Sequence, residues 1–172
     1  MTTLDEIREA GLRARFYRSA EIWRGERFIY VGSYSWRGLS VSDPNGAQIY
    51  LDEPASDERL GNAILEALGQ SRFLSDSECD ALMSTTDERY EQWVARLMSM
   101  YGYKSRRALL KSTVTCSAEV IDPEQIKLCP LKRARGEAWE GMGERFDVLI
   151  PMDRSAAEIG AAVRLALDRA IA

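Results

Sequence analysis

Hydrophobic residues recur with a helical period in two stretches of the chain, residues 56–71 and 155–170. The apolar positions lie three and four residues apart, which places them on one face of an α-helix. The second stretch begins with Ser155 and has Glu158 three residues later, the S-x-x-E pattern of a helix capping box. We therefore predict two amphipathic helices in the same phase. The matched apolar positions are Leu60, Ala63, Ile64, Ala67 and Leu68 in the first stretch, and Ile159, Ala162, Val163, Ala166 and Leu167 in the second.

Both predicted helices share a glycine and a preceding strand. Gly61 and Gly160 directly follow the first matched apolar residue, and a short apolar run at residues 49–51 or 148–150 precedes each helix. Glycine inside a helix costs about 1 kcal/mol relative to alanine, so a shared glycine indicates close backbone approach, for example of a helix against a strand. A repeated strand–helix unit accounts for the match. The alternative is that unrelated strand–turn–helix units look alike at this level.

The first third of the chain alternates apolar and polar residues and predicts an antiparallel meander. Residues 43–46 predict a turn, because proline fixes φ and the Asn-Gly pair tolerates positive φ. Gly32 and Ser33 are expected to interrupt the sheet between two strands. Residues 3–14 predict either a helix or a loosely docked terminal arm. The predicted strands cover residues 15–23, 27–31, 34–41 and 47–51.

The middle of the chain predicts two further helices. Ser75 resembles a helix cap before a short helix that ends near Met83, and a polar break at residues 84–87 precedes a longer helix that Gly102 ends. We interpret the apolar stripe of the longer helix as a core face rather than a cofactor site. The stripe consists of Tyr90, Trp93, Val94, Leu97 and Met98.

The last third predicts more strands before the second amphipathic helix. Pro130 is expected to end one of them, and residues 132–136 are expected to form a basic exposed loop. The pattern as a whole predicts one α+β domain over residues 1–172, an antiparallel sheet with helices packed against it, in which residues 1–15 are a terminal arm or helix. The predicted strands cover residues 113–121, 125–128 and 146–150.

The composition excludes several classes of chemistry. The chain has no histidine, which excludes Ser-His-Asp and Cys-His catalysis, histidine-bound zinc and H-E-x-x-H proteases. Its formal net charge of −4 is unusual for a nucleic-acid-binding protein and favours a basic partner. The three cysteines, with no C-x-x-C pair, predict small buried side chains in a reducing compartment. No signal peptide or membrane span is predicted, so we expect a cytoplasmic protein that does not bind membranes.

No motif predicts catalysis, a metal or a cofactor. G-x-S-x-G, the dinucleotide fingerprint, the phosphate-binding P-loop and the EF-hand spacing are all absent from the sequence. Carboxylate pairs such as Asp57-Glu58 and Asp87-Glu88 lie at predicted helix starts, where the helix dipole explains them. Lys104, Arg106, Arg107 and Lys111 form a basic patch, which we interpret as salt-bridge partners or solvated positions rather than a phosphate site. These observations favour a binding protein over an enzyme.

The order and spacing of several short motifs over about 150 residues resemble one protein family, the CdiI immunity proteins of bacterial contact-dependent growth inhibition (CDI) systems. The first 15 or so residues lie outside the match. The final helix ends in cysteine in many family members, whereas Ala170 stands here, which weakens any role for a terminal thiol. The matching motifs are residues 28–35, Leu60-Gly61 through Glu66-Ala67-Leu68, Ser71-Arg72, residues 101–104, the strand near Cys116, residues 137–141, residues 148–151, residues 158–160 and Ala166-Leu167.

The resemblance implies an immunity protein that binds the C-terminal toxin domain of a large exported effector, CdiA. It would protect the producing cell in the cytoplasm, without catalysis, cofactor or direct contact with nucleic acid. Toxins of such systems are commonly nucleases, whose basic active face an acidic protein can cover. Two other classes stay open: an adaptor or other antitoxin that binds another protein, and a small carboxylate-based enzyme or ligand-binding domain.

We expect the toxin contact to lie on acidic residues between the matching motifs, since pairing between toxin and immunity protein is specific. The candidates are Asp76, Glu78, Asp80, Asp87, Glu88 and Glu91, with Asp52, Glu53 and Asp57 as second choices. The motif residues Gly61, Trp139, Gly160 and Leu167 are interpreted as core and backbone geometry.

Overall fold

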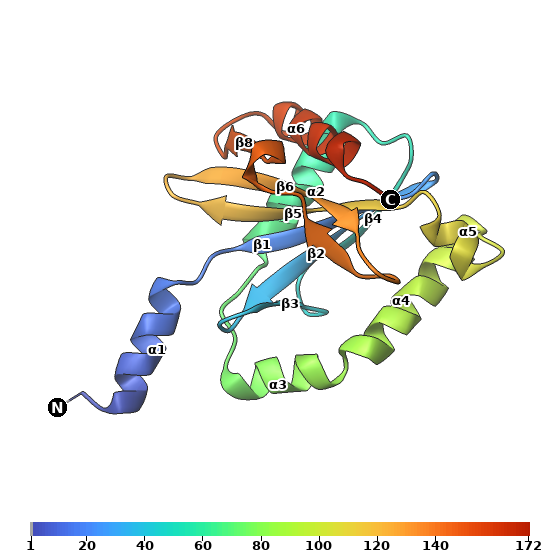
Figure 1. Ribbon diagram of the computed structural model, residues 1–172. Helices are drawn as coiled ribbons and strands as arrows, with labels where there is room; N and C mark the ends of the chain where they lie inside the picture. The colour runs from blue at the N-terminus through green and yellow to red at the C-terminus, as the bar shows by residue number, and fades with distance from the viewer. Residues whose placement is uncertain (1) are drawn as a thin grey trace.

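A curled eight-stranded antiparallel sheet forms the centre of the computed structural model, which describes residues 2–172 (Figure 1). Helices cover both faces of the sheet. The α+β architecture predicted from the sequence is confirmed. The strands are β1 (Ser19–Arg24), β2 (Phe28–Trp36), β3 (Ser40–Ser42), β4 (Gln48–Asp52), β5 (Val114–Ile121), β6 (Gln125–Arg133), β7 (Trp139–Gly141) and β8 (Val148–Pro151).

The sheet consists of two halves with the same topology. In the first, β2 pairs with β1, β3 and β4, and helix α2 (Asp57–Gly69) follows β4. In the second, β6 pairs with β5, β7 and β8, and helix α6 (Ala156–Arg169) follows β8. Strands β1 and β5 join the halves at the centre of the sheet. The repeat therefore includes four strands and a helix, a larger unit than the strand–helix pattern in the sequence indicated.

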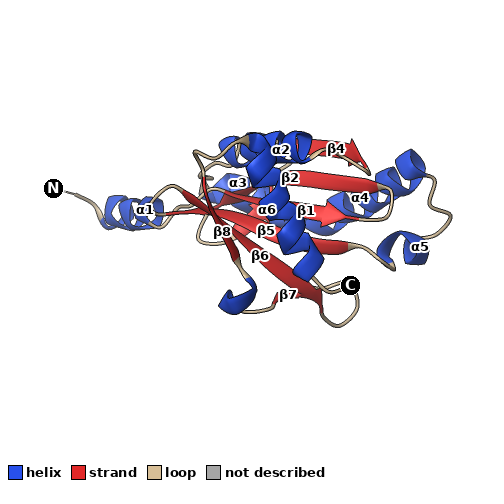
Figure 2. Ribbon diagram, turned by 90° about the horizontal axis from the view of Figure 1, so that it is seen from above, coloured by secondary structure: helices blue, strands red, loops and turns tan. Residues whose placement is uncertain are grey.

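Helices α2 and α6 lie together on one face of the sheet (Figures 1 and 2) and share one core with it. They meet at the two glycines. A Cβ atom on Gly61 would overlap the carbonyl oxygen of Ala156, and one on Gly160 would overlap that of Asp57. The shared glycines thus mark close approach of the two helix backbones. The expectation that each helix would approach a strand at its glycine was wrong.

The helix starts follow the predicted caps. Ser56 accepts a hydrogen bond from the backbone N–H of Arg59. Ser155 and Glu158 form a complete capping box at the start of α6. Between the caps and the helix ends, Leu60, Ile64, Ile159 and Leu167 are among the residues that become fully buried in the core shared with the sheet. The predicted apolar stripes are therefore the faces that fold onto the sheet.

The segment between the two halves covers the opposite face of the sheet (Figure 1). It contains α3 (Asp76–Ser84), α4 (Thr86–Tyr101) and α5 (Arg106–Leu110). Val94 and Leu97 of α4 are buried against Trp23 and Phe28 of the sheet. Gly102 ends α4 in the left-handed conformation, with φ of 69°, where a side chain would be strained. This segment positions the site described below.

Helix α1 (Leu4–Ala14) precedes the sheet and extends away from the rest of the molecule (Figures 1 and 2). Thr3 and Glu6 form a capping box at its start, and none of its residues is buried. Glu9 of α1 pairs with Arg37, which lies just after β2, at 2.6 Å between carboxylate oxygen and guanidinium nitrogen. The predicted helix at the N-terminus therefore forms, with few contacts to the sheet.

Two predicted strand ends are wrong. Strand β2 continues through Gly32 and Ser33 to Trp36, so the break predicted at these two residues lies instead at residues 37–39, between β2 and β3. The ring of Tyr30 lies over Gly32, where a Cβ atom would overlap it, and the Ser33 hydroxyl donates to the carbonyl of Ala67 in α2 at 2.8 Å. Both residues thus join the strand to its neighbours.

Strand β6 likewise continues through Pro130 to Arg133, and the basic loop predicted at residues 132–136 begins two residues later than expected. Pro130 lies opposite Cys116 of β5. It also lies between the stretch of β6 that pairs with β8 and the stretch that pairs with β7. At such a position one edge of the strand has no partner strand, so the N–H that proline lacks costs the sheet little. Among residues 2–172, no helix is both long and apolar enough to cross a membrane.

Candidate functional site

Four of the six acidic candidates, Asp76, Glu78, Asp87 and Glu88, lie in the first turns of α3 and α4, whereas Asp80 and Glu91 lie one turn further on. Three of the six are held by arginines of the same chain. Asp76 pairs with Arg37 at 2.7 Å, and Glu78 pairs with Arg72 at 2.6 Å. Glu91 pairs with Arg106 at 2.6 Å. These distances join carboxylate oxygens to guanidinium nitrogens. The negative charges of Asp76, Glu78 and Glu91 are therefore largely compensated by arginines of the same chain.

Glu78 serves a structural purpose in particular. Its carboxylate accepts the backbone N–H of Ser75 at 2.8 Å and completes the capping box of α3. This hydrogen bond, together with Arg72, lowers the pKa of Glu78 to about 2. Hydrogen bonding from Arg37 likewise lowers the pKa of Asp76. Both carboxylates therefore already have hydrogen-bond and ion-pair partners within the chain when no other protein is bound.

Asp80, Asp87 and Glu88 remain exposed on the outer surface of α3 and α4, and within residues 2–172 none of them forms an ion pair. Glu88 accepts only a hydrogen bond from Gln92 of the next turn, at 3.1 Å. Of the six first-choice candidates, these three are the ones whose charge faces solvent without compensation. We call Asp80, Asp87 and Glu88 the acidic surface.

The second-choice candidates lie around α2. Asp52 is exposed at the end of β4. Asp57 pairs with Arg164 of α6 at 2.7 Å, and Glu53 pairs with the same arginine at 3.4 Å. Arg164 thus ties the two pseudo-equivalent helices together. The structure assigns Glu53 and Asp57 to this packing and does not bring them together with the acidic surface.

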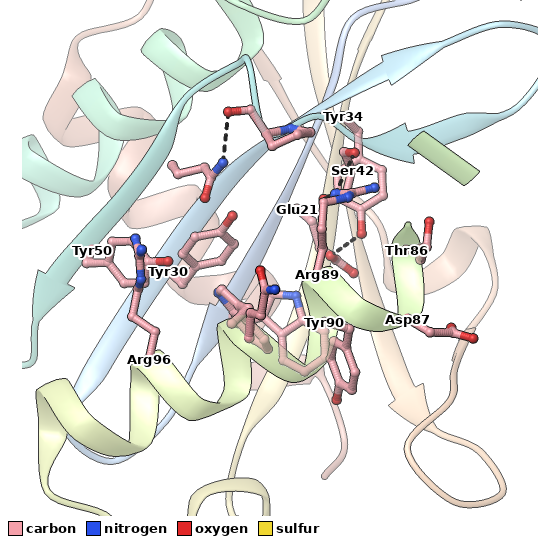
Figure 3. Close-up of a pocket in the computed structure, with 15 residues that line it drawn as sticks. Glu21, Tyr30, Tyr34, Ser42, Tyr50, Thr86, Asp87, Arg89, Tyr90 and Arg96 are labelled. Carbon is pink, nitrogen blue, oxygen red and sulfur yellow. Dashed lines mark hydrogen bonds between the residues drawn. The ribbon is translucent and has the colours of Figure 1, made fainter. Parts of the chain in front are cut away.

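A cavity of about 380 Å³ separates the N-terminal part of α4 from β1, β2 and β4 (Figure 3). Asp87 lies at its rim, on the first turn of α4. No pattern in the sequence predicts this cavity, because its lining residues come from five separate elements, β1, β2, β3, β4 and α4, and from the turn after β3. The charged and tyrosine side chains that line it are Glu21, Tyr30, Tyr34, Tyr50, Asp87, Arg89, Tyr90 and Arg96.

Aromatic rings form most of the wall of the cavity. The centroids of Tyr30 and Tyr50 lie 5.0 Å apart, and Tyr30 meets Trp93 edge-on at 5.2 Å. Trp93 also meets Trp23 of β1 at 4.9 Å. The predicted core stripe of α4 is therefore divided: Val94 and Leu97 are buried in the core, whereas Trp93, like Tyr90, lines the cavity.

Glu21 of β1 is an enclosed acid in this cavity. The Tyr34 hydroxyl donates to its carboxylate at 2.5 Å. Burial raises the pKa of Glu21 and outweighs the hydrogen bonds from Tyr34 and Trp23, which favour the charged form. The carboxyl group is enclosed, although the residue as a whole is only half-buried because it borders the cavity. In the sequence, the only indication of this enclosed acid is that a charged residue stands inside a predicted strand, at the position that faces the cavity.

Two arginines of α4 border the cavity in different ways. Arg89 donates to the carbonyl oxygens of Ser42 and Leu82 at 3.1 and 2.9 Å, which ties α4 to β3 and to α3. Arg96 is exposed, and its charge lies close enough to Tyr50 to oppose the increase in pKa that burial causes there. Arg89 is therefore a structural link, whereas Arg96 is exposed, hydrogen-bonds to Tyr50 and has further N–H donors that a ligand can use.

The basic patch of the sequence analysis is partly a set of salt-bridge partners. Arg106 joins α5 to α4 through Glu91 and to the loop before β7 through Glu137, at 2.5 Å. Arg107 and Lys111 are exposed beside it. Within residues 2–172, no group of three or more histidine, cysteine, aspartate or glutamate side chains is arranged to hold a metal ion.

The fold and this site define an α+β protein with a charged helical surface beside an aromatic cavity. The model of the CDI immunity protein family matches residues 18–170, and the chain belongs to this family. The resemblance found in the sequence is thus confirmed. The match leaves out α1, in agreement with its few contacts.

Individual relatives agree with this assignment. The immunity protein CdiI-YPIII of Yersinia pseudotuberculosis serotype O:3 (strain YPIII) is 35% identical over 158 residues, which cover 83% of this chain and 89% of the relative. A protein of unknown function from Neisseria meningitidis has a TM-score of 0.81 at 31% identity, covering 90% of this chain and 96% of that one. A CdiA-CT/CdiI toxin and immunity complex from Y. pseudotuberculosis contains a chain with a TM-score of 0.77 at 30% identity, covering 90% and 98%.

Proposed function

We propose that this chain binds and neutralises the C-terminal toxin domain of a cognate CdiA effector in the cytoplasm of the cell that produces both. The observation that carries the proposal is the match, over nearly its whole length, to a chain of a toxin and immunity complex. Immunity then acts by tight binding and not by catalysis. Protection at low copy number needs a dissociation constant on the order of 1 nM or below, about −12 kcal/mol.

The cognate toxin in this proposal is a nuclease. A nuclease attracts a polyanionic substrate, so its active face is commonly basic. A protein with net charge −4 and uncompensated carboxylates complements such a face. The acidic surface of Asp80, Asp87 and Glu88 is the toxin contact that this charge argument favours, since the other first-choice carboxylates already have arginine partners.

Charge reversal on the acidic surface tests the contact. The Asp87→Lys, Glu88→Lys double variant is expected to weaken binding of the toxin domain at least tenfold, because two favourable long-range attractions become repulsions. Isothermal titration calorimetry with the purified toxin domain measures this. Glu91 is left unchanged, because its removal would also break the ion pair with Arg106.

A matched double variant controls for helix effects. Glu58 is a first-turn acid of α2. Glu66 of the same helix accepts a hydrogen bond from Gln70 four residues later, as Glu88 does from Gln92. The Glu58→Lys, Glu66→Lys variant makes the same change of net charge on another helix and should leave toxin affinity within twofold. Equal affinity of both double variants would exclude the acidic surface as the contact.

Co-expression tests the function itself. Cells that express the toxin domain from the neighbouring effector gene should survive only when this chain is present. Equal killing with and without it would contradict the immunity function, whatever surface makes the contact. Loss of intact RNA or DNA in the unprotected cells would identify the toxin as a nuclease.

A further inference from the structure

The cavity under α4 has the size and the shape of a small-molecule site. Its volume of about 380 Å³ lies in the range of ligand pockets, which is roughly 300–1,000 Å³. It is lined by aromatic rings with a few polar groups among them, as such pockets usually are. The fold does not fill this space with side chains, although the same helix packs closely at Val94 and Leu97 one turn away.

The aromatic side chains that line the cavity favour a planar ligand. The side chain of Tyr30 lies over Gly32, where a Cβ atom would overlap it, and the ring centroids of Tyr50 and Trp93 lie 5.0 and 5.2 Å from that of Tyr30. These tilted and edge-to-face rings contact one another and together line the cavity. A planar ring is the group that contacts several of these side chains at once.

Several polar groups of the cavity are hydrogen-bond donors. The indole N–H of Trp93 is buried and has no acceptor among residues 2–172. Tyr50 and the exposed guanidinium of Arg96, which lie close together in Figure 3, add further donors to the lining. A buried donor without an acceptor costs roughly 1–3 kcal/mol, which a ligand with an acceptor would recover. A carboxylate is the acceptor that also complements an arginine.

The charges near the cavity agree with an anionic group. Arg89 and Arg96 both border it, and burial favours the neutral form of Glu21. The carboxylate of Glu21 is also already occupied by the Tyr34 hydroxyl. Asp87 is the remaining carboxylate, and it lies at the exposed rim.

We infer that this cavity binds a planar aromatic molecule with one carboxylate, whose ring lies among Tyr30, Tyr50 and Trp93 and whose carboxylate is held by Arg96. Asp87 at the rim of this cavity also belongs to the acidic surface proposed as the toxin contact, whereas Tyr30, Tyr50, Trp93 and Arg96 do not. The inference does not depend on the immunity function.

Three probes with the same ring separate the contributions of shape and charge. Indole-3-acetate is anionic, indole-3-acetamide is neutral and tryptamine is cationic. We expect indole-3-acetate to bind at least tenfold more tightly than tryptamine, with the amide between them. Nitrogen-15 NMR provides a local readout, because the chain has four tryptophans and the Trp93→Phe variant identifies the indole resonance of Trp93. This resonance should shift on binding, and that of Trp36 should not.

Two variants test the role of Arg96. Arg96→Gln should weaken indole-3-acetate about tenfold and leave indole-3-acetamide within twofold. Arg59→Gln, on the exposed surface of α2, should change neither. Equal affinity for all three probes, tightest binding of tryptamine, or shifts at Trp36 instead of Trp93 would each overturn the inference. It would also be overturned if no probe bound at millimolar concentration while the toxin domain alone shifted the Trp93 resonance, which would assign the cavity to the toxin.

Discussion

At the scale of single residues, the crossing of α2 and α6 depends on the absence of two side chains. Gly61→Ala should destabilise the fold by about 3 kcal/mol, because the new Cβ atom meets the backbone carbonyl of Ala156, which cannot rotate away. Urea denaturation measures the change in the free energy of unfolding. Gly69→Ala is the matched control in the same helix: nothing lies within 4 Å of its Cβ position. It should be neutral or stabilising by up to about 1 kcal/mol. An equal loss in both variants would show that helix propensity, not the crossing, is responsible.

Gly61 and Gly160 also show what single residues reveal before the structure is known. Their repetition in phase correctly indicated close backbone approach, since only a steric need explains a glycine in the same helical position twice. The identity of the approaching element could not be derived, because a strand and a second helix need the same empty space. For Gly32, in contrast, the prediction was wrong. It was expected to end a strand, yet it lies inside β2 because Tyr30 covers it.

At the scale of elements, a buried acid joins three parts of the first half. The side chain of Asp43, in the turn after β3, has no exposed surface; it pairs with Arg72 at 2.8 Å and accepts the Ser35 hydroxyl of β2 at 2.6 Å. Burial alone would raise the pKa of Asp43, but the hydrogen bonds from Arg72 and Ser35 outweigh it and lower the pKa. The depressed pKa links the stability of this junction to pH.

Asp43 therefore contributes stability above its unfolded pKa of about 3.9, and this contribution is lost as the pH falls through the lower folded value. Asp43→Asn should cost about 2 kcal/mol at pH 7, because it leaves Arg72 without its charged partner. The difference from the natural chain should shrink steadily below about pH 4. Urea denaturation at pH 7, 4, 3 and 2.5 measures this. Asp80→Asn, at an exposed carboxylate without an ion pair, is the control for the substitution itself at each pH. A constant difference for Asp43→Asn would contradict the link between this junction and pH.

Whether the end of an element can be predicted from the sequence depends on how local the interactions are that determine it. Helix starts were predicted well because a cap is local: Ser56, Ser75 and Ser155 each satisfy a backbone N–H three residues away. Strand ends were predicted poorly at Pro130 because the cost of a proline depends on whether a neighbouring strand needs its N–H. That neighbour, β7 or β8, lies in another part of the chain. Strand β7 was missed for the same reason, since its three residues form a strand only through their pairing with β6.

At the scale of the whole molecule, the sequence predicted the acidic character of the surface but not which charges are available. Asp76 is compensated by Arg37, 39 residues away in the chain, and Asp57 by Arg164, 107 residues away. Such pairs arise only when the two halves and the inserted helices come together. The cavity has the same origin, because β1, β2, β4 and α4 each contribute part of its lining. Long-range packing thus divides the acidic candidates into internal ion pairs and a small uncompensated surface.

The net charge of −4 leads to a kinetic prediction about the proposed complex with a basic toxin. Attraction between opposite net charges accelerates association and is screened by salt, with a Debye length of about 30 Å at 0.01 M and about 10 Å at 0.1 M. The association rate constant with the toxin domain should fall about tenfold between 0.02 and 0.5 M NaCl, while the dissociation rate constant changes much less. Stopped-flow fluorescence measures both. The Asp87→Lys, Glu88→Lys variant should show a smaller dependence of association on salt, and the Glu58→Lys, Glu66→Lys variant has the same net charge. If both variants lose the dependence equally, the overall charge and not the acidic surface guides the toxin. If neither loses it, charges elsewhere on the chain guide the toxin and the acidic surface has no part in steering.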